Sequence, residues 1–145
     1  MRYRFKQLNV SELSDALDLS PIEQLAEPLN RRARHVFHEN NRVLQIRKGV
    51  SAIEFGQLMN ESHLSLKNDY EVSIPALDFM VSLLQQNNDV FGAKLTGASF
   101  GGACVALCGI NSALAVSGSV LKQYNKAGNN ALLIIPQEKH NVATK

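Results

Sequence analysis

The chain has 145 residues, of which 45% are hydrophobic, enough for one compact domain that buries roughly two thirds of its unfolded surface. Lys and Arg number 15 against 13 Asp and Glu, and the net charge of +2 gives no overall attraction to nucleic acid or to an anionic membrane. No apolar run approaches the ~18 residues of a membrane-spanning helix, and no signal-type apolar stretch follows the first six residues. We therefore expect a soluble cytoplasmic protein with no nucleic-acid and no membrane partner.

The first two thirds of the chain carry helical patterns. Ser20-Pro21-Ile22-Glu23 reads as an N-cap, a first-turn proline and a capping-box glutamate, which predicts a short helix. From Leu29 apolar residues recur at spacings of three and four, which predicts a longer helix that stops at Gly49. A second capping box, Ser51 with Glu54, predicts a helix that ends near residues 68–69. A further helical pattern follows Pro75 and runs to about residue 85.

The last third changes to strand patterns. Val90–Thr96 and Cys104–Cys108 read as strands on either side of a glycine-rich stretch, Gly97–Gly102, which predicts a hairpin-like unit. Four steps along a strand separate Cys104 from Cys108 by roughly 13 Å, too far for a disulfide or a shared metal. We expect both cysteines to be small core residues.

One more helix and one more strand complete the pattern. Asn111 can cap the helix, Gly128 can end it, and Ala131–Ile135 reads as a final buried strand before Pro136. The first two strands are joined too tightly for a crossover, so the sheet cannot be all parallel. The predicted fold class is α+β, an antiparallel sheet with helices packed on it. We expect a single domain over residues 1–136 and a tail over 137–145.

The segment with the most chemical information is Thr96-Gly97-Ala98-Ser99-Phe100-Gly101-Gly102. Its three glycines allow positive φ and expose backbone N–H groups, against which a phosphate can bind. A glycine-rich turn that only joins two strands explains the same spacing, so both interpretations stay open at this point. The segment lacks the Gly-Lys-Ser/Thr ending of a P-loop and differs from the GxGxxG of a dinucleotide fold.

The other polar residues give no complete set for catalysis. His35 and His38 lie one turn apart on a predicted helix, but no third or fourth ligand stands at a convincing spacing, so we predict no metal site. The arginines of the same helix spread around it, which favours a solvated surface over a nucleic-acid site. The acidic residues and His63 near positions 61–71 supply no nucleophile, base and orienting group together, so we predict no catalytic residue in this chain.

Several blocks of residues resemble one family. Arg32–Val36, Leu58–His63 and Asp69–Ser73 are similar to the helical half of the C-terminal domain of galactokinases, and Gly92–Ala103 resembles the third motif of the GHMP kinases. The blocks stand in the family's order and spacing over about residues 29 to 136. The Met-Asn-Glu-Ser-His and Asp-Tyr-Glu-Val-Ser blocks point to galactokinases rather than to mevalonate or homoserine kinases, which share only the glycine-rich motif.

This resemblance implies a ferredoxin-like α+β sandwich and a parent enzyme that transfers the γ-phosphate of MgATP to the anomeric hydroxyl of galactose. It also implies that Thr96–Gly102 lies beside the nucleotide phosphates and the sugar. The sequence departs from the family at Ala98 and Ser99, which stand where the family has glycines and add Cβ atoms where the backbone approaches closely.

The family's upstream domain carries an arginine-bearing signature ending in Gly-Glu-His, a phosphate loop rich in glycine and serine, and the catalytic aspartate. None of these is found in this sequence, so we expect the chain alone to be inactive and to bind neither ATP nor magnesium tightly. The expected partner is the N-terminal galactokinase domain. The alternative is a non-catalytic interaction or regulatory module of the same fold, with self-association through an uncovered sheet face or edge.

Overall fold

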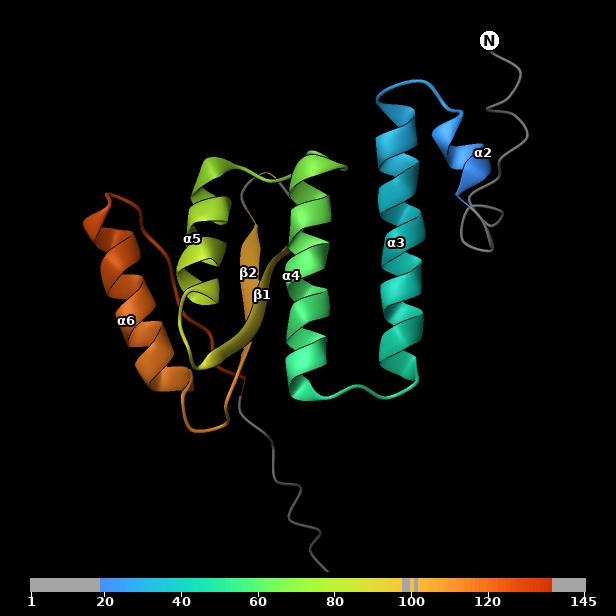
Figure 1. The fold of residues 1–145 in the computed structure, drawn as a ribbon. Helices are drawn as coiled ribbons and strands as arrows, with labels where there is room; N and C mark the ends of the chain where they lie inside the picture. The colour runs from blue at the N-terminus through green and yellow to red at the C-terminus, as the bar shows by residue number, and fades with distance from the viewer. Residues whose placement is uncertain (1–18, 98–99, 101, 137–145) are drawn as a thin grey trace, which may run out of the picture.

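A computed structural model describes residues 19–97, 100 and 102–136 of the chain. The predicted tail over residues 137–145 and the loop residues Ala98, Ser99 and Gly101 lie outside this described part. In chain order the elements are α2 (Ser20–Glu23), α3 (Leu29–Arg47), α4 (Ala52–Asn68), α5 (Pro75–Gln85), β1 (Val90–Thr96), β2 (Ala103–Cys108) and α6 (Ala113–Lys126). α3 and α4 stand side by side on one flank of the β1–β2 pair, and α5 and α6 stand on the other (Figure 1).

The ends of the helices follow the local sequence closely. α4 begins with the predicted capping box, in which Ser51 Oγ accepts the Glu54 N–H at 3.2 Å and the Glu54 carboxylate accepts the Ser51 N–H at 2.8 Å. α3 ends just before Gly49, whose φ of 88° a glycine adopts without strain. The predicted N-cap of α2 is wrong by one residue, because Ser20 already takes helical geometry and Leu19 is the cap.

The capping box of α4 gives a first testable prediction. We expect Ser51→Ala to lower the free energy of unfolding by about 1 kcal/mol, because the Glu54 N–H loses its acceptor. Urea unfolding measures the change, and Ser119→Ala on the exposed face of α6 is the matched control. Equal stabilities of Ser51→Ala and the parent chain would show that the cap contributes nothing.

The two strands form an antiparallel hairpin whose register pairs Ala93 with Ala106 and Leu95 with Cys104. The edge of β1 that faces away from β2 is closed by side chains of the helices. Asn60 Oδ1 of α4 accepts the Ala93 N–H at 2.9 Å, and Gln85 Nε2 of α5 donates to the Ala93 carbonyl at 3.1 Å. Side chains of α4 and α5 therefore take the place of a third strand at this edge.

The core lies between the hairpin and its helices. Ala93 and Leu95 of β1 are almost completely buried, and Val81 of α5 is 1% exposed. α6 packs on α5, where the rings of Phe79 and Tyr124 stack with centroids 5.9 Å apart. Further buried apolar residues are Ile22, Leu58, Met59, Leu77, Val116 and Val120.

The final strand predicted over Ala131–Ile135 is wrong for the structure described here. These residues form no strand, and the side chains of Leu132 and Ile134 are 90% and 80% exposed. The aliphatic composition indicates only that the segment can pair, whereas a strand also needs a neighbouring edge. The sheet has two strands in the described residues, and the segment pairs with neither of them.

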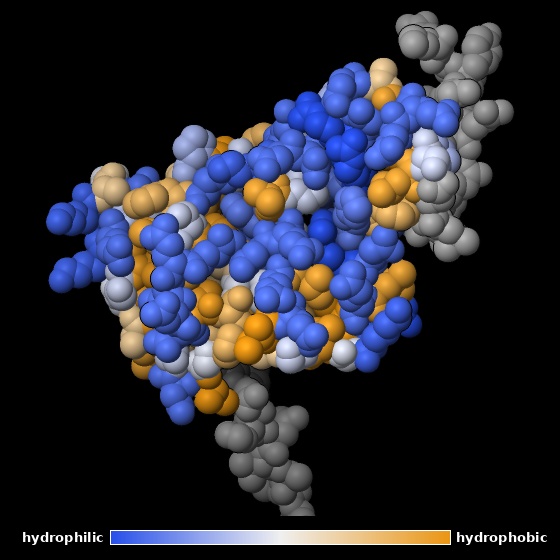
Figure 2. Space-filling model, in the orientation of Figure 1, coloured by the Kyte–Doolittle hydropathy of each residue, from blue (hydrophilic) through white to orange (hydrophobic). Residues whose placement is uncertain are grey.

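The molecular surface seen in Figure 2 is largely hydrophilic, with hydrophobic residues in separate patches. Cys104 and Cys108 are free thiols of intermediate exposure, and burial raises the pKa of Cys104 to about 11. None of the described helices is long and apolar enough to cross a membrane.

Candidate functional site

The glycine-rich loop meets a second segment that lies far from it in sequence. The Phe100 N–H donates to the Val72 carbonyl at 3.1 Å, so the loop is hydrogen-bonded to the turn Asp69–Ser73 that follows α4. Thr96, Gly97, Phe100 and Gly102 are exposed. We define the candidate site as the described loop residues together with this turn.

Both halves of the site hold backbone in an unusual conformation. Glu71 has φ of 60° and Phe100 has φ of 51°, and these are the positive φ values recorded for non-glycine residues in the described part of the chain. Such values are disfavoured by the Cβ atom and persist where the surroundings enforce them, often at functional sites. Gly97, with φ of 85°, needs no such support.

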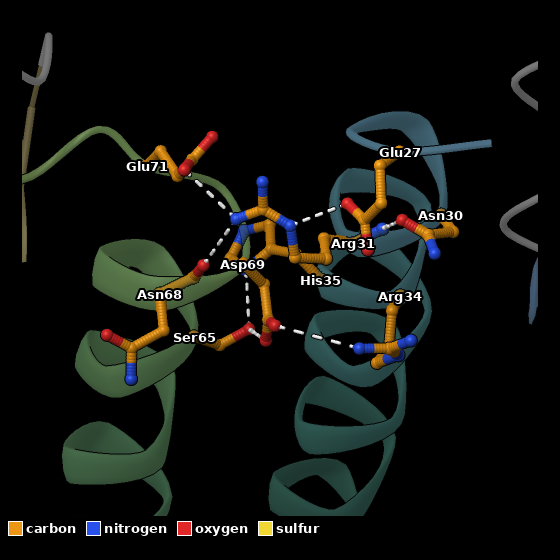
Figure 3. A network of polar contacts seen from close by, with 9 residues as sticks. All are labelled: Glu27, Asn30, Arg31, Arg34, His35, Ser65, Asn68, Asp69 and Glu71. Carbon is orange, nitrogen blue, oxygen red and sulfur yellow. Dashed lines mark hydrogen bonds and ion pairs between the residues drawn. The ribbon is translucent and has the colours of Figure 1, made fainter.

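The Glu71 turn is held by the start of α3 (Figure 3). The Arg31 guanidinium donates to Glu27 at 2.7 Å and to the Asn68 carbonyl at 3.1 Å, and it lies 3.0 Å from the Glu71 carboxylate. Its hydrogen bond lowers the pKa of Glu27, and Glu27 and Glu71 raise the pKa of Arg31. Arg32 approaches the other Glu71 oxygen at 3.8 Å.

A series of hydrogen bonds between α3, α4 and Asp69 supports the same turn. The Ser65 hydroxyl donates to Asp69 at 2.9 Å, so its oxygen is left to accept from His35 Nδ1, also at 2.9 Å. This assigns the Nδ1–H tautomer to His35. The Tyr70 ring stacks on the His35 imidazole with centroids 4.8 Å apart, so the helix α3 fixes the aromatic residue that precedes Glu71.

A second series of polar contacts connects the end of the turn to β1. The Ser73 hydroxyl donates to Asp78 at 2.6 Å, and Lys67 lies 3.0 Å from the other oxygen of that carboxylate. His63 Nε2 lies 3.5 Å from Asp78, and His63 Nδ1 accepts the Leu95 N–H at 3.4 Å. Burial raises the pKa of Asp78, but the hydrogen bonds from Ser73 and Lys67 outweigh it and lower the pKa overall.

The two buried histidines predict a loss of stability in mild acid. Burial lowers the pKa of both His35 and His63 below the ordinary value of 6.5. As the pH falls below about 6.5 the unfolded chain therefore gains protons before the folded chain does, at up to about 1.4 kcal/mol per pH unit for each histidine. Urea unfolding at about pH 7.5 and about pH 5.5 measures the difference.

The matched control for this pH dependence is the double variant His35→Gln, His63→Gln, which we expect to flatten it between these two pH values. Equal stability of the parent chain at both pH values would contradict the neutral, buried state of the histidines.

The described residues contain no group of three or more His, Cys, Asp or Glu side chains that could hold a metal ion. An open groove of ≈ 390 Å³ lies between α3 and α4. Its lining residues are His38, Arg42, Glu61, Leu64, Ser65, Asn68 and Asp69, and no described residue of the glycine-rich loop is among them. The groove is therefore a feature separate from the loop.

Comparison with known proteins decides the family. Residues 45–126, more than half of the chain, match the family model of the GHMP kinases C terminal. The chain belongs to the GHMP kinase family. The structure matches that of Lactococcus lactis galactokinase complexed with galactose, with a TM-score of 0.74 and 34% sequence identity over 85% of this chain and 34% of that one.

Galactokinases are among the curated relatives of this GHMP kinase chain. It is 51% identical to the galactokinase of Roseiflexus sp. over 90 residues, which are 58% of this chain and 22% of that enzyme. It is 42% identical to the galactokinase of Streptococcus thermophilus strain LMD-9 over 114 residues, 68% of this chain and 29% of that enzyme. The chain thus spans less than a third of the length of these two relatives.

The family and the α+β fold class predicted from the sequence are confirmed. The sequence reasoning missed the roles of Glu71 and Arg31. Glu71 belongs to the Asp-Tyr-Glu-Val-Ser block, but nothing in that block indicates a positive φ. The spread of the arginines around their helix predicts solvated side chains, whereas Arg31 is bound by three acceptors and the side chain of Arg42 is only 12% exposed.

Proposed function

We propose that this chain is the C-terminal region of a galactokinase, whose whole enzyme transfers the γ-phosphate of MgATP to the anomeric hydroxyl of galactose. The observation that carries the proposal is the hydrogen bond between Phe100 and Val72. It joins the glycine-rich loop to the Asp-Tyr-Glu-Val-Ser turn, the two blocks by which the sequence resembles galactokinases. The relatives named above, which are galactokinases, support the same substrate class.

The described loop residues fit a phosphate-proximal role. Gly97 is exposed, has a left-handed φ, and would bring an added Cβ no nearer than 4.0 Å to the described residues beyond its chain neighbours, which fits an approachable backbone. Exposed backbone N–H groups in such a loop suit the phosphate oxygens of ATP. This chain spans less than a third of the galactokinases it matches, so we propose that the magnesium ligands and the catalytic base lie in other parts of the enzyme.

Because the magnesium ligands and the catalytic base are proposed to lie in other parts of the enzyme, we expect the 145-residue chain to be inactive by itself. Phosphoryl transfer depends on positioning MgATP against the acceptor hydroxyl, and this chain spans too little of a galactokinase to do so alone. ADP release by the purified chain, measured with galactose and MgATP, tests this expectation. Robust turnover without a partner would overturn it.

The loop is tested in a chimera, in which residues 29–126 of this chain replace the matching region of Lactococcus lactis galactokinase. We expect Gly101→Val to lower kcat/KM for both galactose and ATP, because a branched side chain obstructs close approach of substrate to backbone. The paired variant Ala98→Gly, Ser99→Gly restores the family's glycines and should raise kcat/KM. Unchanged kinetics in both variants would reject a phosphate-proximal loop.

We further propose that the chain self-associates through the outer edge of β2. Helix side chains close the free edge of β1, whereas no described strand pairs with the outer edge of β2. Val105 on this strand is 44% exposed, and the unpaired segment Ala131–Ile135 is aliphatic. An open apolar edge favours pairing with another chain.

Sedimentation of the chain across a range of concentrations tests the self-association. We expect Val105→Lys, which adds a charge to the edge, to shift the population toward monomer. Val43→Lys on α3, also an exposed valine, is the matched control. A monomeric parent chain at all concentrations would reject this proposal and leave the kinase assignment untouched.

A further inference from the structure

Glu71 is a charged residue in a backbone conformation that its Cβ disfavours, with φ of 60°. The sequence supplies no glycine or asparagine there, which are the residues that tolerate this region most easily. Interactions with neighbouring residues must therefore stabilise the positive φ of Glu71. The side chain of Glu71 is about half exposed, so burial of the side chain does not explain its conformation.

The groups that reach Glu71 come from the first turn of α3. Arg31 Nη1 lies 3.0 Å from one carboxylate oxygen, and Arg32 lies 3.8 Å from the other. Arg31 is itself anchored, because it donates to Glu27 at 2.7 Å and to the Asn68 carbonyl at 3.1 Å (Figure 3). One planar guanidinium thus connects the segment before α3, the end of α4 and the Glu71 turn.

Among the described residues, one backbone hydrogen bond joins the turn to the glycine-rich loop. Val72 is buried, its N–H donates to the Leu66 carbonyl at 3.1 Å, and its own carbonyl accepts the Phe100 N–H at 3.1 Å. The Glu71 dihedrals set the direction in which the chain enters Val72, and therefore where the Val72 carbonyl, one peptide plane further along, can lie. Phe100 also has positive φ, so this hydrogen bond connects the two disfavoured conformations.

We propose that Arg31 is a positioning residue for the glycine-rich loop, acting by holding Glu71 in its left-handed conformation so that the Val72 carbonyl meets the Phe100 N–H. Arg31 touches no loop residue itself in the contacts recorded for the described chain. The functional meaning of this connection rests on the proposed role of the loop beside substrate, but the connection is measurable without any substrate.

Amide hydrogen exchange in the full 145-residue chain tests the proposal. Arg31→Gln keeps helix propensity and removes the guanidinium, and we expect it to speed exchange at the Phe100 amide by about three- to tenfold. The amide of Val120 in the middle of α6 is the internal reference and should not change. Arg47→Gln at the far end of α3 is the matched control variant.

A double-mutant cycle of Arg31→Gln with Glu71→Gly distinguishes an effect that passes through the Glu71 conformation from a general destabilisation of the helices. Glycine adopts positive φ freely, so Arg31→Gln should cause no further acceleration at Phe100 when Glu71 is already glycine. Arg31→Lys should rescue Phe100 protection only partly in the parent background, since one ammonium cannot hold three acceptors in the same planar geometry.

Three results would overturn the proposal: unchanged Phe100 exchange in Arg31→Gln, equal acceleration at Val120, or the same acceleration in the Glu71→Gly background. These outcomes are independent of the kinase assignment. An inactive chimera with an intact Arg31 effect would reject the proposed function alone.

Discussion

Gly92→Ala is expected to lower the free energy of unfolding by about 3 kcal/mol or more, which for a chain of this size removes much of its stability. A Cβ on Gly92 would lie 2.0 Å from the carbonyl oxygen of Gly56, and a Cβ on Gly56 would lie 2.2 Å from that of Phe91. The obstructing atoms are backbone on both sides, so no side chain can turn away. Either substitution must push α4 away from β1.

The same displacement would break the polar contacts that close the edge of β1. Asn60 and His63 accept the N–H groups of Ala93 and Leu95 from the helix that carries Gly56. We therefore expect Gly56→Ala to destabilise as strongly as Gly92→Ala, although glycine to alanine inside a helix ordinarily stabilises by up to about 1 kcal/mol.

Gly118→Ala is the matched control for both substitutions, because Gly118 lies within α6 and an added Cβ there would meet no described atom within 4 Å apart from its chain neighbours and the backbone of its own helix. It should be neutral or stabilising by up to about 1 kcal/mol. Urea unfolding of the three variants measures the contrast. If Gly56→Ala and Gly118→Ala have the same stability, α4 and β1 do not meet in the way described.

Glu39→Gln should produce the second large loss of stability, roughly 2 to 3 kcal/mol, since the site is only partly shielded from water. The Glu39 carboxylate accepts from Ser62 at 2.8 Å and from Arg42 at 2.6 Å, and Lys94 lies 3.7 Å away. Burial raises the pKa of Glu39, but these hydrogen bonds outweigh it and lower the pKa overall. Arg42 Nη2 is already buried without a hydrogen-bond partner, so the loss of the carboxylate leaves that cation poorly compensated.

Three further variants identify the cause of this loss: Glu61→Gln, Lys94→Met and the double variant Glu39→Gln, Lys94→Met. Glu61 also approaches Arg42, at 3.7 Å, but it is 60% exposed, so Glu61→Gln should change the stability by less than about 1 kcal/mol. Adding Lys94→Met to Glu39→Gln should cost less than the sum of the single changes, because it removes an ammonium that has lost the Glu39 carboxylate as its counter-charge. Thermal unfolding of the parent chain, Glu39→Gln, Lys94→Met and the double variant gives the coupling, and strict additivity would show that Glu39 and Lys94 do not interact.

Local patterns predicted much of the fold. The capping box at Ser51, the helix stop at Gly49 and the hairpin around the glycine-rich loop depend on residues close in sequence, and each is present in the structure. The segment Ala131–Ile135 depends instead on a neighbouring strand edge. Its apolar run could not indicate whether that neighbour exists, so the predicted strand was wrong.

The site was predictable only in part for the same reason. The glycine content of Gly97–Gly102 marks the loop directly, but the turn that contacts it is about 30 residues away. Arg31 lies 40 residues before Glu71, and the periodicity of a helix does not show which carboxylate an arginine will meet. The family resemblance indicated which blocks matter, whereas the left-handed φ of Glu71 could be found only from the structure.

Galactose-dependent ADP release by the unmodified chimera tests the central claim most directly. If residues 29–126 of this chain form the C-terminal region of a galactokinase, the folded chimera should phosphorylate galactose with MgATP, and its kcat/KM should fall when Gly101 becomes valine. A chimera that folds and shows no galactose-dependent ADP release, even after Ala98 and Ser99 are replaced by glycine, would contradict that claim.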